Sequence, residues 1–336
     1  RPDAGPPQGH PMRRILVTDY QWPTLDIERH ILAPVQGELV VAPTGEEAEL
    51  LRLAPGCEAI LTCWKKVTER VVDAMPGCRV VVRYGIGLDN ICVEHCTRLG
   101  IPVTNAPTYC LEEVAEHALT LLLTLARRVT RFDRALRGGA YNGVPFAGMR
   151  RVSGKTLGII GYGHIGRTLA PKGRGLGLNI LVHDPAVKSL PPAEGRAVDL
   201  DTLLGQADFI SVHAPLLPGT RGLINAERLA KVKPGCFLAN TSRGPLVELD
   251  AVLDALNAGR LGGCALDVFP NEPPDLSHPL FSHPHFIATP HAAFYSEESV
   301  EDLQHTSATQ VLDALSGRVP SPIVNPDYVK VKPRFA

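Results

Sequence analysis

Three glycines spaced Gly161-x-Gly163-x-x-Gly166 stand between a short apolar run and a stretch with helical periodicity. The run 156–160 predicts a buried strand, and the chain from Ile165 onwards predicts a helix. In this context Gly161 permits a tight turn, Gly163 lets the backbone approach an anion, and Gly166 allows close helix–strand packing. Unpaired amides at the helix N-terminus would bind phosphate groups. The sequence therefore predicts a dinucleotide-binding strand–turn–helix.

A second apolar run, 179–183, ends at Asp184. An acid at the end of that strand can accept hydrogen bonds from the adenosine ribose hydroxyls and would repel a 2′-phosphate. NAD is therefore the expected cofactor, and Lys188 nearby keeps NADP as an alternative. Pro171, Gly173 and Gly175 disfavour helix interiors, so the helix after the glycine loop is expected to be short or kinked.

Composition excludes several classes of function. The 34 basic and 35 acidic residues give a net charge of −1, so neither nucleic acid nor a membrane surface is an expected partner. The longest apolar run, 118–126, is too short to span a bilayer. Eight cysteines without a C-x-x-C pair indicate reduced thiols in a cytoplasmic protein. Cys92, His95 and Cys96 share a helical neighbourhood but lack a second ligand cluster, so no metal is expected.

Alternation of apolar runs with amphipathic stretches indicates an α/β fold with two doubly wound parallel-sheet domains. The expected strands are 15–18, 39–42, 59–62, 80–83 and 103–104, then 157–160, 180–182, 209–212, 236–239, 263–266 and 286–288. Residues 111–136 predict one helix that is apolar nearly all round, and 297–315 predicts a helix that packs back on the first domain. The expected domains are 13–104 with 296–336, and 105–295, after a flexible leader at 1–12.

Three further segments place an arginine, a carboxylate and a histidine downstream of the glycine loop: Ser242-Arg243-Gly244, Asn271-Glu272-Pro273 and Pro290-His291-Ala292. A guanidinium can hold a carboxylate and polarise a carbonyl. An imidazole can protonate the alkoxide that hydride transfer creates, and a glutamate can orient that imidazole. Arg243, Glu272 and His291 are thus candidate catalytic residues for reducing a 2-keto acid.

These motifs closely resemble the D-2-hydroxyacid dehydrogenase family over roughly residues 14–329. The marks of the family include Asn240-Thr-Ser-Arg-Gly244, Ala265-Leu-Asp-Val-Phe269 and Arg83-Tyr-Gly-Ile-Gly-Leu-Asp-Asn-Ile91. Within it, 292–297 and 316–320 look most like the branch of the C-terminal-binding-protein corepressors. Phe294 stands where that branch has tryptophan, and Cys92 where the family has an acid.

The resemblance implies a Rossmann NAD-binding domain, a flavodoxin-like substrate domain, a cleft between them and a homodimer formed partly by the 111–136 helix. It assigns the catalytic roles above to the same three residues. The cofactor contacts it implies are Gly161, Tyr162, Gly163, His164, Ile165, Gly166, Asp184, His213, Ala214, Pro215, Thr220, Thr241, Ser242 and Asp267.

For the substrate, the resemblance places carboxylate-binding amides at Gly85, Ile86 and Gly87, with Asn105 at the crossing between domains. Trp64 and Phe294, with Tyr295, are candidates for the pocket wall, although each aromatic could equally be core. Lys65 and Lys66 could meet a second anionic group or form a solvated loop.

The expected function is hydride transfer between NAD(H) and a small 2-keto or D-2-hydroxy acid. One alternative is an NAD(H)-sensing scaffold that resembles the corepressors, and another is a dehydrogenase of an acid such as phosphite. The complete set of Arg243, Glu272 and His291 favours catalysis over a scaffold. A glutamate beside the histidine disfavours the formate type, which uses an amide there.

Overall fold

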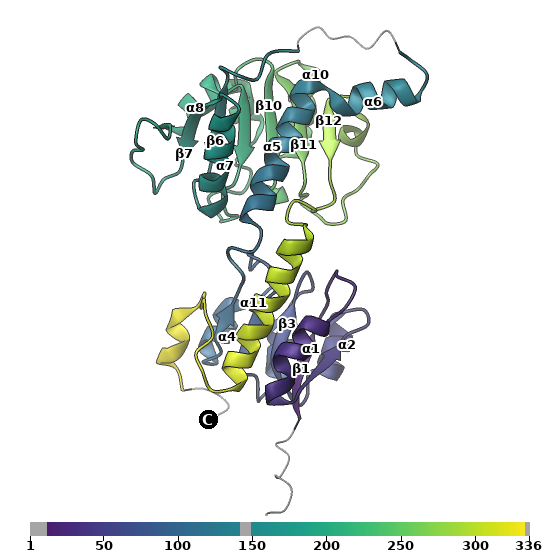
Figure 1. Ribbon diagram of the computed structural model, residues 1–336, viewed down its shortest axis with the longest axis vertical. Coiled ribbons are helices and arrows are strands. Elements are labelled where there is room, and N and C mark those ends of the chain that lie inside the picture. The colour runs from purple at the N-terminus through teal and green to yellow at the C-terminus, as the bar shows by residue number, and fades with distance from the viewer. Residues whose placement is uncertain (1–11, 142–148, 333–336) are drawn as a thin grey trace, which may run out of the picture. The chain divides into compact units, whose positions relative to one another are not determined.

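The computed structural model describes residues 12–141 and 149–332, so most of the expected leader lies outside the described residues. Contacts divide the chain into two compact units (Figure 1). Unit 1 comprises residues up to Tyr109 together with those from Ser296 onwards, and unit 2 comprises Cys110–Tyr295. Within the described residues, no helix is both long and apolar enough to cross a membrane.

Unit 1 is a five-stranded parallel sheet with helices on both faces. Its strands are β1 (Arg13–Val17), β2 (Gly37–Val41), β3 (Cys57–Thr62), β4 (Val80–Arg83) and β5 (Val103–Thr104), in the order β2-β1-β3-β4-β5. Its helices are α1 (Asp26–Leu32), η1 (Ala33–Val35), α2 (Glu47–Leu53), α3 (Glu69–Asp73), α4 (Val93–Arg98), α11 (Glu297–Leu315) and η4 (Pro326–Lys330). This strand order is that of flavodoxin-like sheets.

Successive strand residues in unit 1 point to opposite faces, and each face has its own core. Ile15, Leu61 and Val82 pack under α1 and α11, whereas Leu16, Ile60 and Val81 pack under α2, α3 and α4. Strands buried on both faces give the near-continuous apolar runs seen in the sequence. The helix expected at 297–315 forms with those bounds and contacts α1 and β4, so it does pack on the first unit.

A buried carboxylate fastens α11 to the rest of unit 1. Glu28 of α1 has no exposed surface, and its two oxygens accept from the Tyr84 hydroxyl and the Gln304 amide, each at 2.9 Å. Burial and the neighbouring Glu28 raise the pKa of Tyr84 well above its ordinary value, so the phenol stays a hydrogen-bond donor. The contact thus joins two segments that lie far apart in the sequence.

Glu28→Ala should lower the free energy of unfolding by about 3 kcal/mol, because it leaves the buried Tyr84 hydroxyl and one of the two amide hydrogens of Gln304 without an acceptor. Glu28→Gln, which keeps one carbonyl oxygen, should cost less. Both tryptophans of the chain, Trp22 and Trp64, lie in unit 1, so urea unfolding followed by tryptophan fluorescence measures the change. An alanine variant as stable as the parent would show that this buried contact contributes nothing.

Unit 2 is a seven-stranded parallel sheet. Its strands are β6 (Thr156–Ile160), β7 (Asn179–His183), β8 (Arg196–Ala197), β9 (Phe209–Val212), β10 (Cys236–Asn240), β11 (Leu261–Leu266) and β12 (Phe286–Ala288), in the order β12-β11-β10-β9-β6-β7-β8. Because β6 lies between β7 and β9, the loop after β6 stands where the strand order reverses, which is where open α/β sheets bind ligands.

Helices cover both faces of the unit 2 sheet. The face formed by Leu157, Ile159 and Val182 packs against α5 (Leu111–Arg127) and α7 (His164–Gly175). The other face packs against α8 (Leu200–Gln206), α9 (Ala226–Lys231) and α10 (Leu249–Asn257). The short helix η2 (Gly244–Leu246) follows β10, and the short helix η3 (Pro279–Ser282) precedes β12. The expected α/β class, with two doubly wound parallel sheets, is confirmed.

Two expectations about helices in unit 2 need correction. Residues 111–136 do not form one helix: Arg128 adopts φ 54° and ψ 31°, and α6 (Val129–Arg137) follows it. A left-handed residue cannot continue a right-handed helix, and the Arg128 amide instead closes the last turn on the Leu125 carbonyl at 3.2 Å. In contrast, α7 runs unbroken for 12 residues with Pro171 inside it, so the helix is not short, and the alternative of a kink at Pro171 stays a prediction.

Candidate active site

The glycine loop joins β6 to α7 in unit 2. Gly161 has φ 92°, and a Cβ built there would come within 2.6 Å of the His213 carbonyl carbon. A Cβ on Gly166 would lie 2.4 Å from the Gly161 oxygen, so only glycine permits this close helix–strand approach. Around Gly163, the residue that caps α7, a Cβ would meet nothing within 4 Å. The loop therefore has the shape of a phosphate cradle with open space at its middle glycine.

Asp184 follows β7 and is tied to this loop. One carboxylate oxygen accepts from the Tyr162 amide at 2.7 Å, and the other accepts from the Ala186 amide at 2.8 Å. The carboxylate remains partly exposed. Asp184 therefore fixes the first turn of the glycine loop while keeping surface available to a ligand.

The segment after β9 adds a second wall near the glycine loop. The Ser242 hydroxyl donates to the Ala214 carbonyl at 2.6 Å, and the Thr220 hydroxyl donates to the Pro215 carbonyl at 2.7 Å. The imidazole of His213, however, is half-buried and lies 2.8 Å from the Ser211 hydroxyl, and partial burial lowers its pKa to about 4. His213 therefore faces the glycine loop through its backbone, while its side chain contacts Ser211.

The candidate acid–base pair lies in loops that follow β11 and β12. His291 Nδ1 is 2.7 Å from Glu272 Oε2, and the other Glu272 oxygen accepts from the Phe269 amide at 3.0 Å. The His291 and Glu272 side chains are 24% and 34% exposed, so the pair is reachable yet sheltered. The Phe294 ring packs edge-on to the imidazole, with 6.5 Å between ring centroids. Sequence positions 19 residues apart thus form one site.

The charge balance of this pair favours the ionised carboxylate. Burial alone would raise the pKa of Glu272, but the hydrogen bond and charge of His291, the Phe269 amide and the charge of Arg243 together lower it. Arg243 leads into η2 after β10, and its Nη1 donates to the Ser242 carbonyl at 2.8 Å. The three predicted catalytic side chains therefore gather in unit 2, on loops at the carboxyl ends of neighbouring strands.

Unit 1 holds most of the predicted substrate contacts. Gly85 has φ 142°, which leaves the turn after β4 to glycine. The Asn105 amide donates to the Ile86 carbonyl at 2.8 Å, so this side chain supports the turn. The buried Arg83 guanidinium donates to the Tyr84 carbonyl and lies 5.5 Å from the centre of the Trp64 ring. The predicted carboxylate turn and Trp64, one of the predicted wall residues, therefore adjoin within unit 1.

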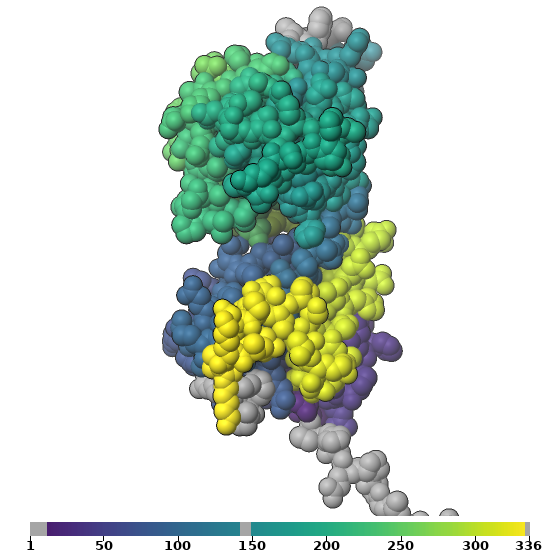
Figure 2. Space-filling view, turned by 90° about the vertical axis from the view of Figure 1, so that its left-hand side faces the viewer, coloured from purple at the N-terminus to yellow at the C-terminus, as the bar shows by residue number. Residues whose placement is uncertain are grey.

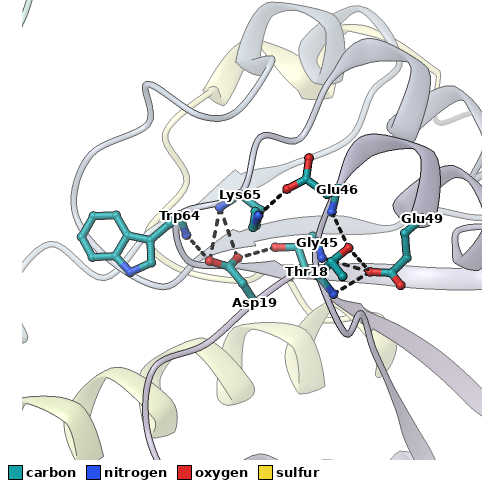
Figure 3. A network of polar contacts seen from close by, with 8 residues as sticks. Thr18, Asp19, Gly45, Glu46, Glu49, Trp64 and Lys65 are labelled. Carbon is teal, nitrogen blue, oxygen red and sulfur yellow. Dashed lines mark hydrogen bonds and ion pairs between the residues drawn. The ribbon is translucent and has the colours of Figure 1, made fainter. Parts of the chain in front are cut away.

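A carboxylate missed by sequence reasoning holds the Trp64 loop in place. Asp19, just after β1, accepts from the Cys63 amide at 3.0 Å. It also accepts from the amides of Trp64 at 2.6 Å and Lys65 at 3.3 Å (Figure 3). The Lys65 ammonium instead pairs with Glu46 at 2.9 Å, while Lys66 is exposed. The sequence signal for this role was an acidic residue at the end of the first strand, but the amides that it binds lie 44 to 46 residues away.

Comparisons with known proteins agree with this geometry. Residues 119–293 match the family described as D-isomer specific 2-hydroxyacid dehydrogenase, NAD binding domain. A glyoxylate reductase from Thermofilum pendens is 35% identical over 293 residues, covering 85% of this chain and 86% of that protein. The chain belongs to this family of NAD-binding 2-hydroxyacid dehydrogenases. The family accounts for the glycine loop and the two parallel sheets together.

Other members of the dehydrogenase family are similar over nearly the whole chain. A D-3-phosphoglycerate dehydrogenase from Mycobacterium leprae is 35% identical over 317 residues, which are 90% of this chain but 60% of that longer protein. The crystal structure of a D-lactate dehydrogenase from Aquifex aeolicus, complexed with NAD and lactic acid, superposes with a TM-score of 0.82 at 27% identity. That superposition covers 95% of this chain and 98% of the other. The expected corepressor-like branch stays a prediction.

Proposed function

We propose that the chain is an NAD-dependent D-2-hydroxyacid dehydrogenase that reduces a small 2-keto acid. The observation that carries this proposal is the 2.7 Å pair of His291 and Glu272 beside Arg243, in the unit that carries the glycine loop. His291 supplies the proton, Glu272 orients the imidazole and Arg243 binds the carboxylate and polarises the carbonyl. A nicotinamide bound along the glycine loop supplies the hydride.

The substrate contacts of unit 1 are part of the same proposal. Amides of the Gly85–Gly87 turn bind the substrate carboxylate, and Trp64 with Arg83 lines the space for its side chain. Asn105 acts by supporting the turn. In unit 2, Phe294 lines the space for the substrate side chain beside His291. A scaffold that only senses NAD(H) would have no use for a complete acid–base pair, so catalysis is favoured.

The direct test is a screen for NADH oxidation against glyoxylate, pyruvate, hydroxypyruvate and branched 2-keto acids, with NAD reduction by D-lactate and 3-phosphoglycerate in the reverse direction. The substrates are chosen because the relatives include a glyoxylate reductase, a D-3-phosphoglycerate dehydrogenase and a D-lactate dehydrogenase. Turnover of at least one acid, with the D-enantiomer as product, supports the proposal. Inactivity on the entire panel in both directions, with NADH bound, would overturn it.

NADH should bind more tightly than NADPH, because a 2′-phosphate would meet the Asp184 carboxylate. Asp184→Asn keeps an oxygen for the Tyr162 amide but removes the charge, so it should reduce the preference for NADH by about tenfold or more. Asp184→Ala should also lower the affinity for NADH, since the glycine loop loses the hydrogen bond to Asp184. Calorimetric titration with both cofactors measures these effects, and a parent that prefers NADPH would contradict the assignment.

We also propose a homodimer formed through α6. Val129, Phe132 and Leu136 lie on one face of this helix and are 54%, 37% and 59% exposed, an apolar stripe that a second copy would cover. Light scattering should give twice the chain mass. Phe132→Asp combined with Leu136→Asp should give monomers, whereas the control Arg134→Asp should not. A parent that is monomeric at micromolar concentration would refute this interface.

A cytoplasmic setting is part of the proposal as well. No disulfide joins the eight cysteines, all of which the structure describes; seven of them are buried and Cys92 is half-buried. Burial raises the pKa of Cys63 and of Cys78 to about 12, which keeps both as unreactive thiols. A reducing compartment suits a chain with this many free thiols.

A further inference from the structure

A histidine outside the catalytic trio contacts the loop that carries His291. His117 lies on α5, and its Nε2 is 3.0 Å from the hydroxyl oxygen of Thr289 and 3.6 Å from Asp267 Oδ1. Its side chain is 25% exposed, whereas the neighbouring helical residues Ala115 and Ala118 are buried in the apolar core. The apolar contacts already hold α5 on the sheet, so this polar contact serves something other than helix docking.

The hydrogen bonds fix which atom donates. The Thr289 hydroxyl donates to Asp267 Oδ1 at 2.6 Å, and an ionised carboxylate can only accept. The single hydroxyl proton is thereby used, so the Thr289 oxygen must accept from His117. His117 therefore carries its proton on Nε2, and two successive hydrogen bonds lead from His117 as donor through Thr289 to Asp267 as acceptor.

Asp267 in turn fixes the backbone that presents His291. It follows β11, has no exposed surface, and its carboxylate accepts from the amides of Ala292 and Ala293, each at 2.9 Å. Its carbonyl accepts from the His291 amide at 2.7 Å. His291 has φ 52°, a left-handed conformation that residues other than glycine rarely adopt. Three consecutive amides thus hold the imidazole in an orientation that the backbone does not favour by itself.

We propose that His117 is a positioning residue for the catalytic acid. By donating to Thr289 it keeps the hydroxyl turned toward Asp267, and so fixes the loop that aims His291 at the substrate. The effect of His117 on catalysis rests on the proposed function, whereas its hydrogen bonds to the His291 loop do not depend on that function. A histidine that merely fills space would tolerate an apolar replacement without disturbing the loop that Asp267 holds through the Ala292 and Ala293 amides.

The test compares His117→Leu, which has no donor, with His117→Gln, whose side-chain amide nitrogen can occupy the position of Nε2. His117→Leu should lower kcat for keto-acid reduction by about ten- to a hundredfold with unchanged NADH affinity. His117→Gln should recover most of that loss. Thr289→Val should match His117→Leu, and the double variant should be no worse than either single one, because both break the same chain.

Hydrogen exchange measured by mass spectrometry supplies a readout that needs no turnover. Peptides covering 289–295 should exchange faster in His117→Leu than in the parent, while those covering the glycine loop should not change. Equal kcat and equal exchange in parent and His117→Leu would overturn the proposal, as would additive losses in the double variant. If the parent reduces no keto acid, the proposed function fails, and the exchange data still decide the positioning role.

Discussion

Arg243→Ala should lower kcat/KM for keto-acid reduction by at least about a thousandfold. The guanidinium has two tasks, since it binds the substrate carboxylate and stabilises the negative charge that develops on the carbonyl oxygen. Its charge also contributes to lowering the pKa of Glu272. Steady-state kinetics on the best substrate from the panel measures the loss.

The matched control is Arg243→Lys, which keeps the charge but loses the planar two-pronged donor, so it should fall between parent and alanine variant. NADH affinity, measured by titration of cofactor fluorescence, should survive both changes because the glycine loop is untouched. If Arg243→Ala kept the catalytic efficiency of the parent, the carboxylate would have to be bound elsewhere and the proposed mechanism would be wrong.

His291→Ala should lower kcat by about a hundredfold to ten-thousandfold, because the alkoxide loses its proton donor. Substrate binding should persist in part, since Arg243 and the unit 1 turn remain. The loss should therefore appear mainly in kcat rather than KM. Full activity of His291→Ala on every acid that the parent reduces would exclude His291 as the acid.

Glu272→Gln should act through pH. Because the pKa of Glu272 is lowered, its carboxylate stays ionised at pH values where an ordinary glutamate would begin to take up a proton. In Glu272→Gln the imidazole of His291 faces a neutral amide in place of its anionic partner. The pH above which reduction slows should therefore move downward, while the maximal rate at low pH changes little. A profile identical to that of the parent would show that the 2.7 Å contact does not tune the acid.

Sequence reasoning located the strands because both sheets are buried on two faces. The runs at Phe209–Val212 and Phe286–Ala288 have the expected bounds in the structure. In contrast, β8 is only two residues long and begins with an arginine, so no apolar run in the sequence indicates this strand. The break at Arg128 was also invisible, because arginine is a good helix former and only its backbone conformation ends α5.

The motifs identified the glycine loop and the His291–Glu272 pair, but not the residues that support them. Asp19 and His117 act on loops distant in the sequence, so no local spacing connects them to their partners. Motif reasoning likewise could not separate the backbone of His213, which lies against Gly161, from its side chain, which contacts Ser211. Supporting contacts of this kind depend on tertiary packing, and only a three-dimensional structure reveals them.

The position of α11 in the chain also determines the order in which the two units can fold during synthesis on the ribosome. Unit 2 is continuous and can fold once Tyr295 has emerged, yet unit 1 lacks α11 until the residues after it are made. Until then the sheet face with Ile15, Leu61 and Val82 has only α1 over it. Figure 2 shows the late segment, in yellow, lying against earlier parts of the same unit. The first segment of unit 1 thus stays partly uncovered until α11 is made, and this interval is when nascent chains are most open to chaperones and to aggregation.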